Sequence, residues 1–124
     1  MKILLLLFIF IKILFGFSVE GSFEAARQKA FKEKKVMMVL LTTKDSVSSK
    51  QELQKIINNK KLRKLIEKKA VFVIVYKEQK ESYPIEMLYT KSIPSLFFLD
   101  SNELFICKEL YAPMKQEAIM RCLE

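Results

Sequence analysis

The chain contains no histidine and no tryptophan, and only two of its 124 residues are glycine. Without histidine, the Ser/His/Asp and Cys/His arrangements of nucleophilic enzymes are excluded, as is every metal site that uses histidine. Because Gly16 and Gly21 are the only glycines, residues 22–124 cannot contain the Gly-rich loop of a P-loop or dinucleotide fold. The sequence therefore excludes histidine-based catalysis and argues against nucleotide chemistry.

Cysteine is almost as scarce, since the chain has only Cys107 and Cys122. Two cysteines are too few for a four-thiolate zinc site or a disulfide-rich scaffold. They form either one disulfide or two buried free thiols, and a redox-active pair is a further alternative. We expect no metal and no cofactor.

Apolar residues are concentrated at the amino terminus, where Lys2 precedes an apolar run over residues 3–15 that is interrupted by Lys12. The run is short for a bilayer span, and Gly16 and Ser18 suit the −3 and −1 positions of a cleavage site. We predict a signal peptide over residues 1–18 and one domain over residues 19–124. The alternative is an uncleaved anchor formed by residues 3–15.

Basic residues outnumber acidic ones by 22 to 14, which gives a formal net charge of +8. They gather at residues 29–35 and 60–69, between the apolar positions of predicted helices. Solvated helix faces explain this pattern. Attraction to an anionic membrane surface or an acidic partner stays open, whereas the export segment argues against a nucleic-acid partner.

The first half of the domain predicts a helix, strand, helix, strand order. Ser22 suits the N-cap of a helix whose apolar face includes Phe31. Residues 36–41 and 70–76 are unbroken apolar runs, typical of parallel strands that are covered on both faces. We predict a helix over 48–68 between them, bent or broken at 58–61.

The second half predicts a change of architecture. Tyr83 and Pro84 begin a short predicted helix that ends near residue 89. Residues 95–99 and 104–107 form a predicted hairpin, with Asn102 as the residue best suited to a left-handed backbone. A final helix is predicted from Pro113.

This order of elements resembles the thioredoxin-like superfamily, and its exported bacterial members most of all. The resemblance covers residues 22–124 and includes the strands, residues 46–49, the triplet Ile93, Pro94 and Ser95, and Tyr111 before the last helix. It implies an α/β fold, with a central mixed sheet flanked by helices and a cis-proline at Pro94 before the C-terminal hairpin. It also implies the bacterial periplasm, or the inner membrane if residues 3–15 remain as an anchor.

The chain departs from this family at the redox motif. The Cys-x-x-Cys pair falls on Ser46, Val47, Ser48 and Ser49, so both thiols are replaced by hydroxyls. Thiol exchange requires a thiolate and a resolving sulfur, and serine supplies neither. The buried acid that many thioredoxins carry falls on Leu40. We therefore predict no catalytic residue at this motif.

These serines suit three different roles. Ser46, Ser48 and Ser49 all suit the start of a helix. A Ser-Lys hydrolase would require Lys44 or Lys50 as a base, although both lysines are protonated at neutral pH. In the third role, Ser46 lines a groove with Ile93, Pro94 and Ser95, where the family pairs its backbone with an extended polypeptide.

We therefore expect an exported, non-catalytic protein-binding module that works in an oxidising compartment. The alternative is a thiol-disulfide oxidoreductase that uses Cys107 and Cys122, predicted to lie on the last strand and the last helix. A disulfide between them would close a loop of about 16 residues and stabilise the domain by about 3 kcal/mol. The sequence does not identify the partner or the oligomeric state.

Overall fold

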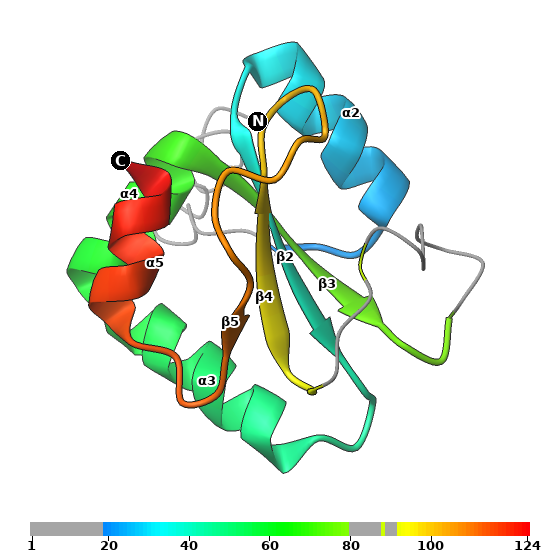
Figure 1. The fold of residues 1–124 in the computed structure, drawn as a ribbon, viewed down its shortest axis with the longest axis vertical. Helices are drawn as coiled ribbons and strands as arrows, with labels where there is room; N and C mark the ends of the chain where they lie inside the picture. The colour runs from blue at the N-terminus through cyan, green and yellow to red at the C-terminus, as the bar shows by residue number, and fades with distance from the viewer. Residues whose placement is uncertain (1–18, 80–87, 89–91) are drawn as a thin grey trace, which may run out of the picture.

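A computed structural model describes residues 19–79, 88 and 92–124. The predicted signal or anchor segment lies outside these residues, as does the short helix predicted from Tyr83 apart from Leu88. Five strands and four helices are seen in this part of the chain (Figure 1). In chain order they are β1 (Val19–Glu20), α2 (Phe23–Glu33), β2 (Val36–Thr42), α3 (Val47–Asn58), α4 (Lys60–Lys69), β3 (Ala70–Tyr76), β4 (Ser95–Leu99), β5 (Leu110–Tyr111) and α5 (Gln116–Leu123).

The strands form one mixed sheet in the order β1-β3-β2-β4-β5. β2 is central: it runs parallel to β3, with Val36 beside Ala70, and antiparallel to β4, with Leu41 beside Ser95. The two unbroken apolar runs are therefore neighbouring parallel strands joined through helices, as predicted. β1, which pairs in parallel with β3, was not predicted.

Alternate residues of the central strand supply two separate cores, one on each face of the sheet. Met37, Val39 and Leu41 pack on the side of α2. Met38 and Leu40 pack on the other side, with residues of α3, α4 and α5. Figure 1 shows α2 on one side of the sheet and the other three helices opposite. Both faces of β2 are covered, which explains its uninterrupted apolar sequence.

Helices α2, α3 and α4 agree with the prediction except at one residue, Phe31. Ser22 caps α2 as predicted, but Phe31 is 65% exposed and does not belong to the buried face. The helix predicted over 48–68, bent or broken at 58–61, is broken into two helices, which end and begin around Asn59. Asn59 is extended, and its side chain accepts a hydrogen bond from the Leu62 N–H at 3.1 Å. This cap starts a new helix within the predicted break.

The C-terminal hairpin is also different from the prediction. Residues 104–107 do not form a regular strand: Phe105 makes one isolated bridge with Leu99, and the strand that pairs with β4 is β5. Glu103, rather than Asn102, has the left-handed backbone, with a φ of 65°. The Asp100 carboxylate accepts hydrogen bonds from the Asn102 and Leu104 N–H groups and so stabilises this turn. The last helix begins at Gln116, three residues later than predicted.

Candidate functional site

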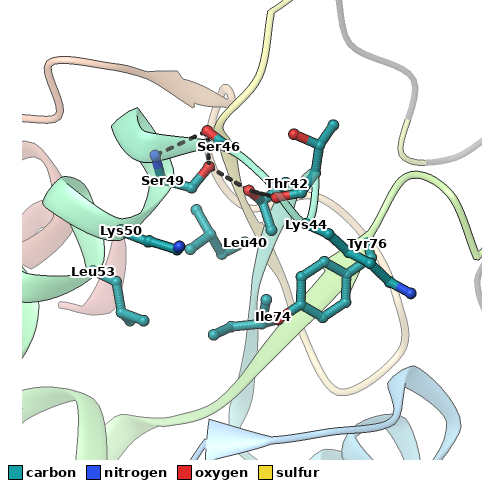
Figure 2. Close-up of a pocket in the computed structure, with 10 residues that line it drawn as sticks. Leu40, Thr42, Lys44, Ser46, Ser49, Lys50, Leu53, Ile74 and Tyr76 are labelled. Atoms are coloured by element: carbon teal, nitrogen blue, oxygen red, sulfur yellow. Dashed lines mark hydrogen bonds between the residues drawn. The ribbon is translucent and has the colours of Figure 1, made fainter.

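The site predicted from the redox motif lies where β2 ends and α3 begins. Ser46 is the N-cap of α3, and its Oγ accepts a hydrogen bond from the Ser49 N–H at 3.0 Å. Figure 2 shows both serine side chains directed toward each other at this turn. Ser46 therefore performs the capping role that its residue type favours.

A third hydroxyl, which the sequence analysis missed, completes a network with these serines. Ser49 Oγ lies 2.8 Å from Ser46 Oγ and is also hydrogen-bonded to Thr42 Oγ1 (Figure 2). Thr42 and Ser49 are both buried. Burial of these hydroxyls is tolerated because each has a partner. The hydroxyls of Thr42, Ser49 and Ser46 thus form a hydrogen-bonded chain at the start of α3.

The other two residues of the motif do not face this network. Val47 is 66% exposed, and Ser48 is exposed as well. Only the first and last positions of the four-residue motif are therefore brought together.

A pocket of about 60 Å³ opens beside the hydroxyl network. Its apolar lining includes Leu40, Leu53 and Ile74, and Tyr76 lies at its side (Figure 2). The polar lining comes from the hydroxyl network, Thr43, Lys44 and Lys50. The volume suits a few water molecules or the end of one side chain.

The arrangement does not provide a serine nucleophile. Ser46 Oγ accepts hydrogen bonds from both the N–H and the Oγ of Ser49. Within the part of the chain that the structure describes, neither the Lys44 nor the Lys50 ammonium hydrogen-bonds to this oxygen. Both lysines are exposed, so no desolvated base is present to remove the serine proton.

The triplet predicted to form a groove lies next to this site but is mostly buried. The Ile93–Pro94 and Ala112–Pro113 peptide bonds are both cis. Ser95 is fully buried and is paired with Leu41 on one side and Tyr111 on the other. Continuing the β2 and β4 register by one residue places Pro94 opposite Thr42.

Ile93 is the member of the triplet that is only half-buried, and it packs against the core on the α2 side. Among the described residues, none of the three lines the pocket beside Ser46. The backbone at Ser95 is already paired on both sides within the sheet.

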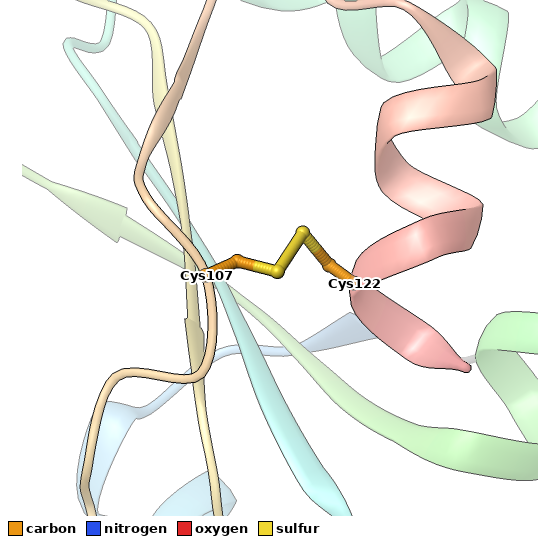
Figure 3. Close-up of a disulfide and its surroundings, with 2 residues drawn as sticks. All are labelled: Cys107 and Cys122. Atoms are coloured by element: carbon orange, nitrogen blue, oxygen red, sulfur yellow. A yellow bond between two sulfur atoms is a disulfide. The ribbon is translucent and has the colours of Figure 1, made fainter.

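Cys107 and Cys122 form a disulfide, with their Cα atoms 5.9 Å apart (Figure 3). Cys122 lies in α5, but Cys107 lies in the irregular segment between β4 and β5 rather than on a strand as predicted. Both are half-buried and pack against the core on the side of α3, α4 and α5. Neither cysteine lines the pocket, so the sulfurs lie outside the site that contains Ser46 and Ser49.

No three His, Cys, Asp or Glu side chains of residues 19–79, 88 and 92–124 are grouped so that they could hold a metal ion. No helix in the same residues has the length and apolar character needed to cross a membrane.

Comparisons with known proteins support the fold. No family model matches the chain, and no curated protein matches it in sequence. A thioredoxin from Thermus thermophilus is similar in structure, with a TM-score of 0.65, 13% identity and coverage of 83% of this chain and 82% of that one.

Two further solved structures have the same architecture. One is described as DsbH oxidoreductase, with a TM-score of 0.59, 14% identity and coverage of 75% of this chain and 72% of that one. The other is a disulphide isomerase from Xylella fastidiosa Temecula1, with a TM-score of 0.57, 15% identity and coverage of 79% and 82%. These likenesses, together with the strand order of the mixed sheet, show that the chain has a thioredoxin-like fold.

Proposed function

We propose that this chain is an exported binding module of thioredoxin-like fold, which recognises an extended polypeptide and does not exchange disulfides. The observation that carries the proposal is the hydroxyl network of Thr42, Ser46 and Ser49 at the start of α3. Similar folds belong to proteins described as a thioredoxin, an oxidoreductase and a disulphide isomerase. In this chain the start of α3, where the family resemblance places the redox pair, carries the hydroxyls of Ser46 and Ser49.

The lack of sulfur at the start of α3 removes both the attacking thiolate and the resolving thiol of disulfide exchange from this site. Attack on a disulfide requires a thiolate, and completion requires a second thiol that resolves the mixed disulfide. A helix start lowers the pKa of a cysteine enough to form a thiolate near neutral pH, but a serine hydroxyl has no comparable ionised form there. Leu40, which is buried below the network, also cannot move a proton.

The surface around the network suits binding. Val47 projects into solvent beside a pocket with an apolar floor and two flanking lysines, Lys44 and Lys50. We propose that one partner side chain enters this pocket while the partner backbone extends toward Ile93. The lysines favour a partner that carries carboxylates near the inserted side chain.

The first experiment measures disulfide reduction and oxidation by the purified chain. We expect no turnover above background. The alternative is an oxidoreductase that uses the disulfide seen between Cys107 and Cys122. Turnover that disappears in Cys107→Ser or Cys122→Ser would establish that alternative and reject the proposal.

The second experiment locates the partner surface. A photoreactive residue at exposed position 47 should crosslink a partner in cells, whereas the same residue at exposed position 117 in α5 serves as the matched control. Lys44→Glu with Lys50→Glu should reduce crosslinking from position 47. Crosslinks of equal yield from positions 47 and 117, or crosslinks insensitive to the lysine changes, would contradict binding at this pocket.

A further inference from the structure

Four lysines meet at the end of the sheet where the two central strands begin. Lys34 and Lys35 directly precede β2, and Lys68 and Lys69 are the last residues of α4, directly before β3. The strands start side by side, with Val36 beside Ala70. Lys35 Nζ also donates to the Glu67 carbonyl at 3.1 Å, which joins the two segments. We refer to Lys34, Lys35, Lys68 and Lys69 as the lysine pole.

Two large apolar side chains project into solvent at the same end of the molecule. Phe31, in the last turn of α2, is 65% exposed, and Leu104 is 63% exposed. The β2 and β4 register, continued by one residue, places Asp100 opposite Val36, and the Asp100 N–H donates to the Leu104 carbonyl at 2.8 Å. An ion pair of 3.8 Å between Arg27 and Glu103 holds this turn against α2. In Figure 1 the end of α2 and this turn lie together at the top of the molecule.

The acidic groups at this end are mostly engaged. Glu33 pairs with Lys35 at 3.6 Å, Glu103 pairs with Arg27, and the Asp100 carboxylate accepts two backbone N–H groups. Glu67 is half-buried in α4, and Glu124 is exposed at the end of α5. Lys34, Lys68 and Lys69 are exposed, and no carboxylate of the described residues pairs with them. Their charge is therefore available to a partner.

The direction in which the chain enters β1 indicates what kind of partner the lysine pole contacts. β1 is parallel to β3, with Val19 beside Phe72, so the chain enters the sheet from the end that carries the lysine pole. In the sequence, the residues before Val19 include the apolar run over residues 3–15, which the alternative prediction retains as a membrane anchor. Lysines around protruding apolar side chains are the combination that binds the interface of an anionic bilayer.

We propose that the lysine pole, with Phe31 and Leu104, rests on an anionic membrane surface. The ammonium groups contact lipid headgroups, and the two apolar side chains enter the boundary between headgroups and acyl chains. The pocket beside Ser46 follows the opposite end of β2, so this orientation points it away from the bilayer and toward a partner.

The first test uses the absence of tryptophan from the chain, which allows a single fluorophore to be introduced. Phe31→Trp and Leu104→Trp are the test variants, and Val47→Trp, which is equally exposed at the opposite end, is the control. The full chain is mixed with vesicles of phosphatidylcholine and phosphatidylglycerol that carry brominated acyl chains. We expect a blue shift and quenching for both test variants and neither effect for the control.

The second test compares two variants with the same net charge. Lys34→Glu/Lys68→Glu/Lys69→Glu alters the pole, and Lys44→Glu/Lys50→Glu/Lys115→Glu alters exposed lysines elsewhere. The readout is binding to phosphatidylglycerol vesicles relative to pure phosphatidylcholine vesicles, which separates headgroup attraction from apolar insertion. Each lysine at a membrane surface is worth about fivefold in binding, so we expect the ratio to fall roughly 100-fold or more for the pole variant. The control variant should keep most of the preference for phosphatidylglycerol vesicles. In 0.5 M salt this preference should disappear in all proteins.

Several outcomes would overturn the membrane orientation. Equal losses in both charge variants would mean that net charge alone drives binding, and no loss in either would mean that the lysines have no role. Quenching of Val47→Trp without quenching at positions 31 and 104 would place the opposite end on the bilayer. None of these results bears on disulfide turnover, so the binding function and the membrane orientation fail or stand separately. Circular dichroism and melting temperature confirm that each variant is folded.

Discussion

The Glu52 carboxylate accepts a hydrogen bond from the backbone N–H of Met114, 62 residues further along the chain, at 3.2 Å. Glu52 is only 5% exposed, and its other oxygen forms an ion pair of 3.1 Å with Lys55. Because Met114 directly follows the Ala112–Pro113 segment and precedes α5, this contact fastens the helix of the candidate site to the C-terminal part of the domain.

Removal of the Glu52 carboxylate should therefore destabilise the domain. In Glu52→Ala the buried Met114 N–H loses its acceptor, and an unsatisfied group of this kind costs about 1–3 kcal/mol. Glu52→Gln retains an acceptor oxygen and should cost less. Urea denaturation measures both changes.

Two variants serve as controls for this prediction. Gln54→Ala, at an exposed position of the same helix, should change the free energy of unfolding by no more than about 0.5 kcal/mol. Lys55→Ala should cost at most about 1 kcal/mol, because the lysine is half exposed. A Glu52→Ala protein as stable as Gln54→Ala would show that the contact with Met114 contributes nothing.

Restoring sulfur at the two network serines should produce a dithiol. Ser46 and Ser49 already direct their Oγ atoms toward each other at 2.8 Å, so cysteines placed there should pair in air. Thiol titration and mass spectrometry of Ser46→Cys/Ser49→Cys would measure this pair beside the native disulfide. Disulfide exchange should be measurable but weak, because Leu40 supplies no proton relay.

The matched control for the restored dithiol is Ser46→Cys/Ser48→Cys, since Ser48 faces solvent. These two thiols should remain free and titrate fully. If the Ser46→Cys/Ser49→Cys protein folds but its thiols neither pair nor react, the assignment of this turn to the redox motif is wrong.

The native disulfide should stabilise the C-terminal segment. Cys107 and Cys122 are 15 residues apart in sequence, and closure of a loop of that length is worth about 3 kcal/mol on the chain-entropy model. Cys107→Ser/Cys122→Ser should lose about that amount in urea denaturation, with faster amide exchange in β5. Reductant should lower the stability of the wild-type chain to that of the double variant, and it should leave the stability of the double variant unchanged. Equal stability of oxidised wild type and the double variant would contradict this prediction.

The break between α3 and α4 should depend on one side chain. Asn59 caps α4 through Leu62 and also donates to the Gln116 side chain, so Asn59→Ala should lose about 1–2 kcal/mol. Asn58→Ala, at the exposed neighbouring position, should be nearly neutral. A gain in stability for Asn59→Ala would mean that a continuous helix is preferred after all.

Elements that are determined by a local sequence pattern were predicted correctly, whereas a strand pairing that depends on contacts distant in sequence was not. The β2 and β3 strands were predicted well because both faces of each are covered, so every residue in the run had to be apolar. The strand paired with β4 was placed at 104–107 because those residues are apolar, yet the pairing chosen by the chain is Leu96 with Leu110. Only contacts distant in sequence distinguish these two choices.

At the candidate site, Ser46 and Ser49 were found through the family resemblance. Thr42 was missed because a threonine at the end of a strand has no local pattern that marks it as a hydrogen-bond partner. Glu52 was missed because its residue type argues against burial, since charged residues are rarely buried. Its position does indicate burial, because Glu52 lies at helical spacing between the buried residues Ser49 and Ile56. Its partners, Met114 and Lys55, explain the exception.

The alternation of β2 between two cores has a consequence for the chemistry of the site. Thr42 lies on the same face of the strand as Met38 and Leu40, and this parity directs its hydroxyl to Ser49. A slip of one residue would exchange the contents of the two cores and turn this hydroxyl toward α2. The polar character of the pocket is therefore a property of strand pairing as much as of residue identity. An inserted or deleted residue in β2 would erase the hydroxyl network even if Thr42, Ser46 and Ser49 were all retained.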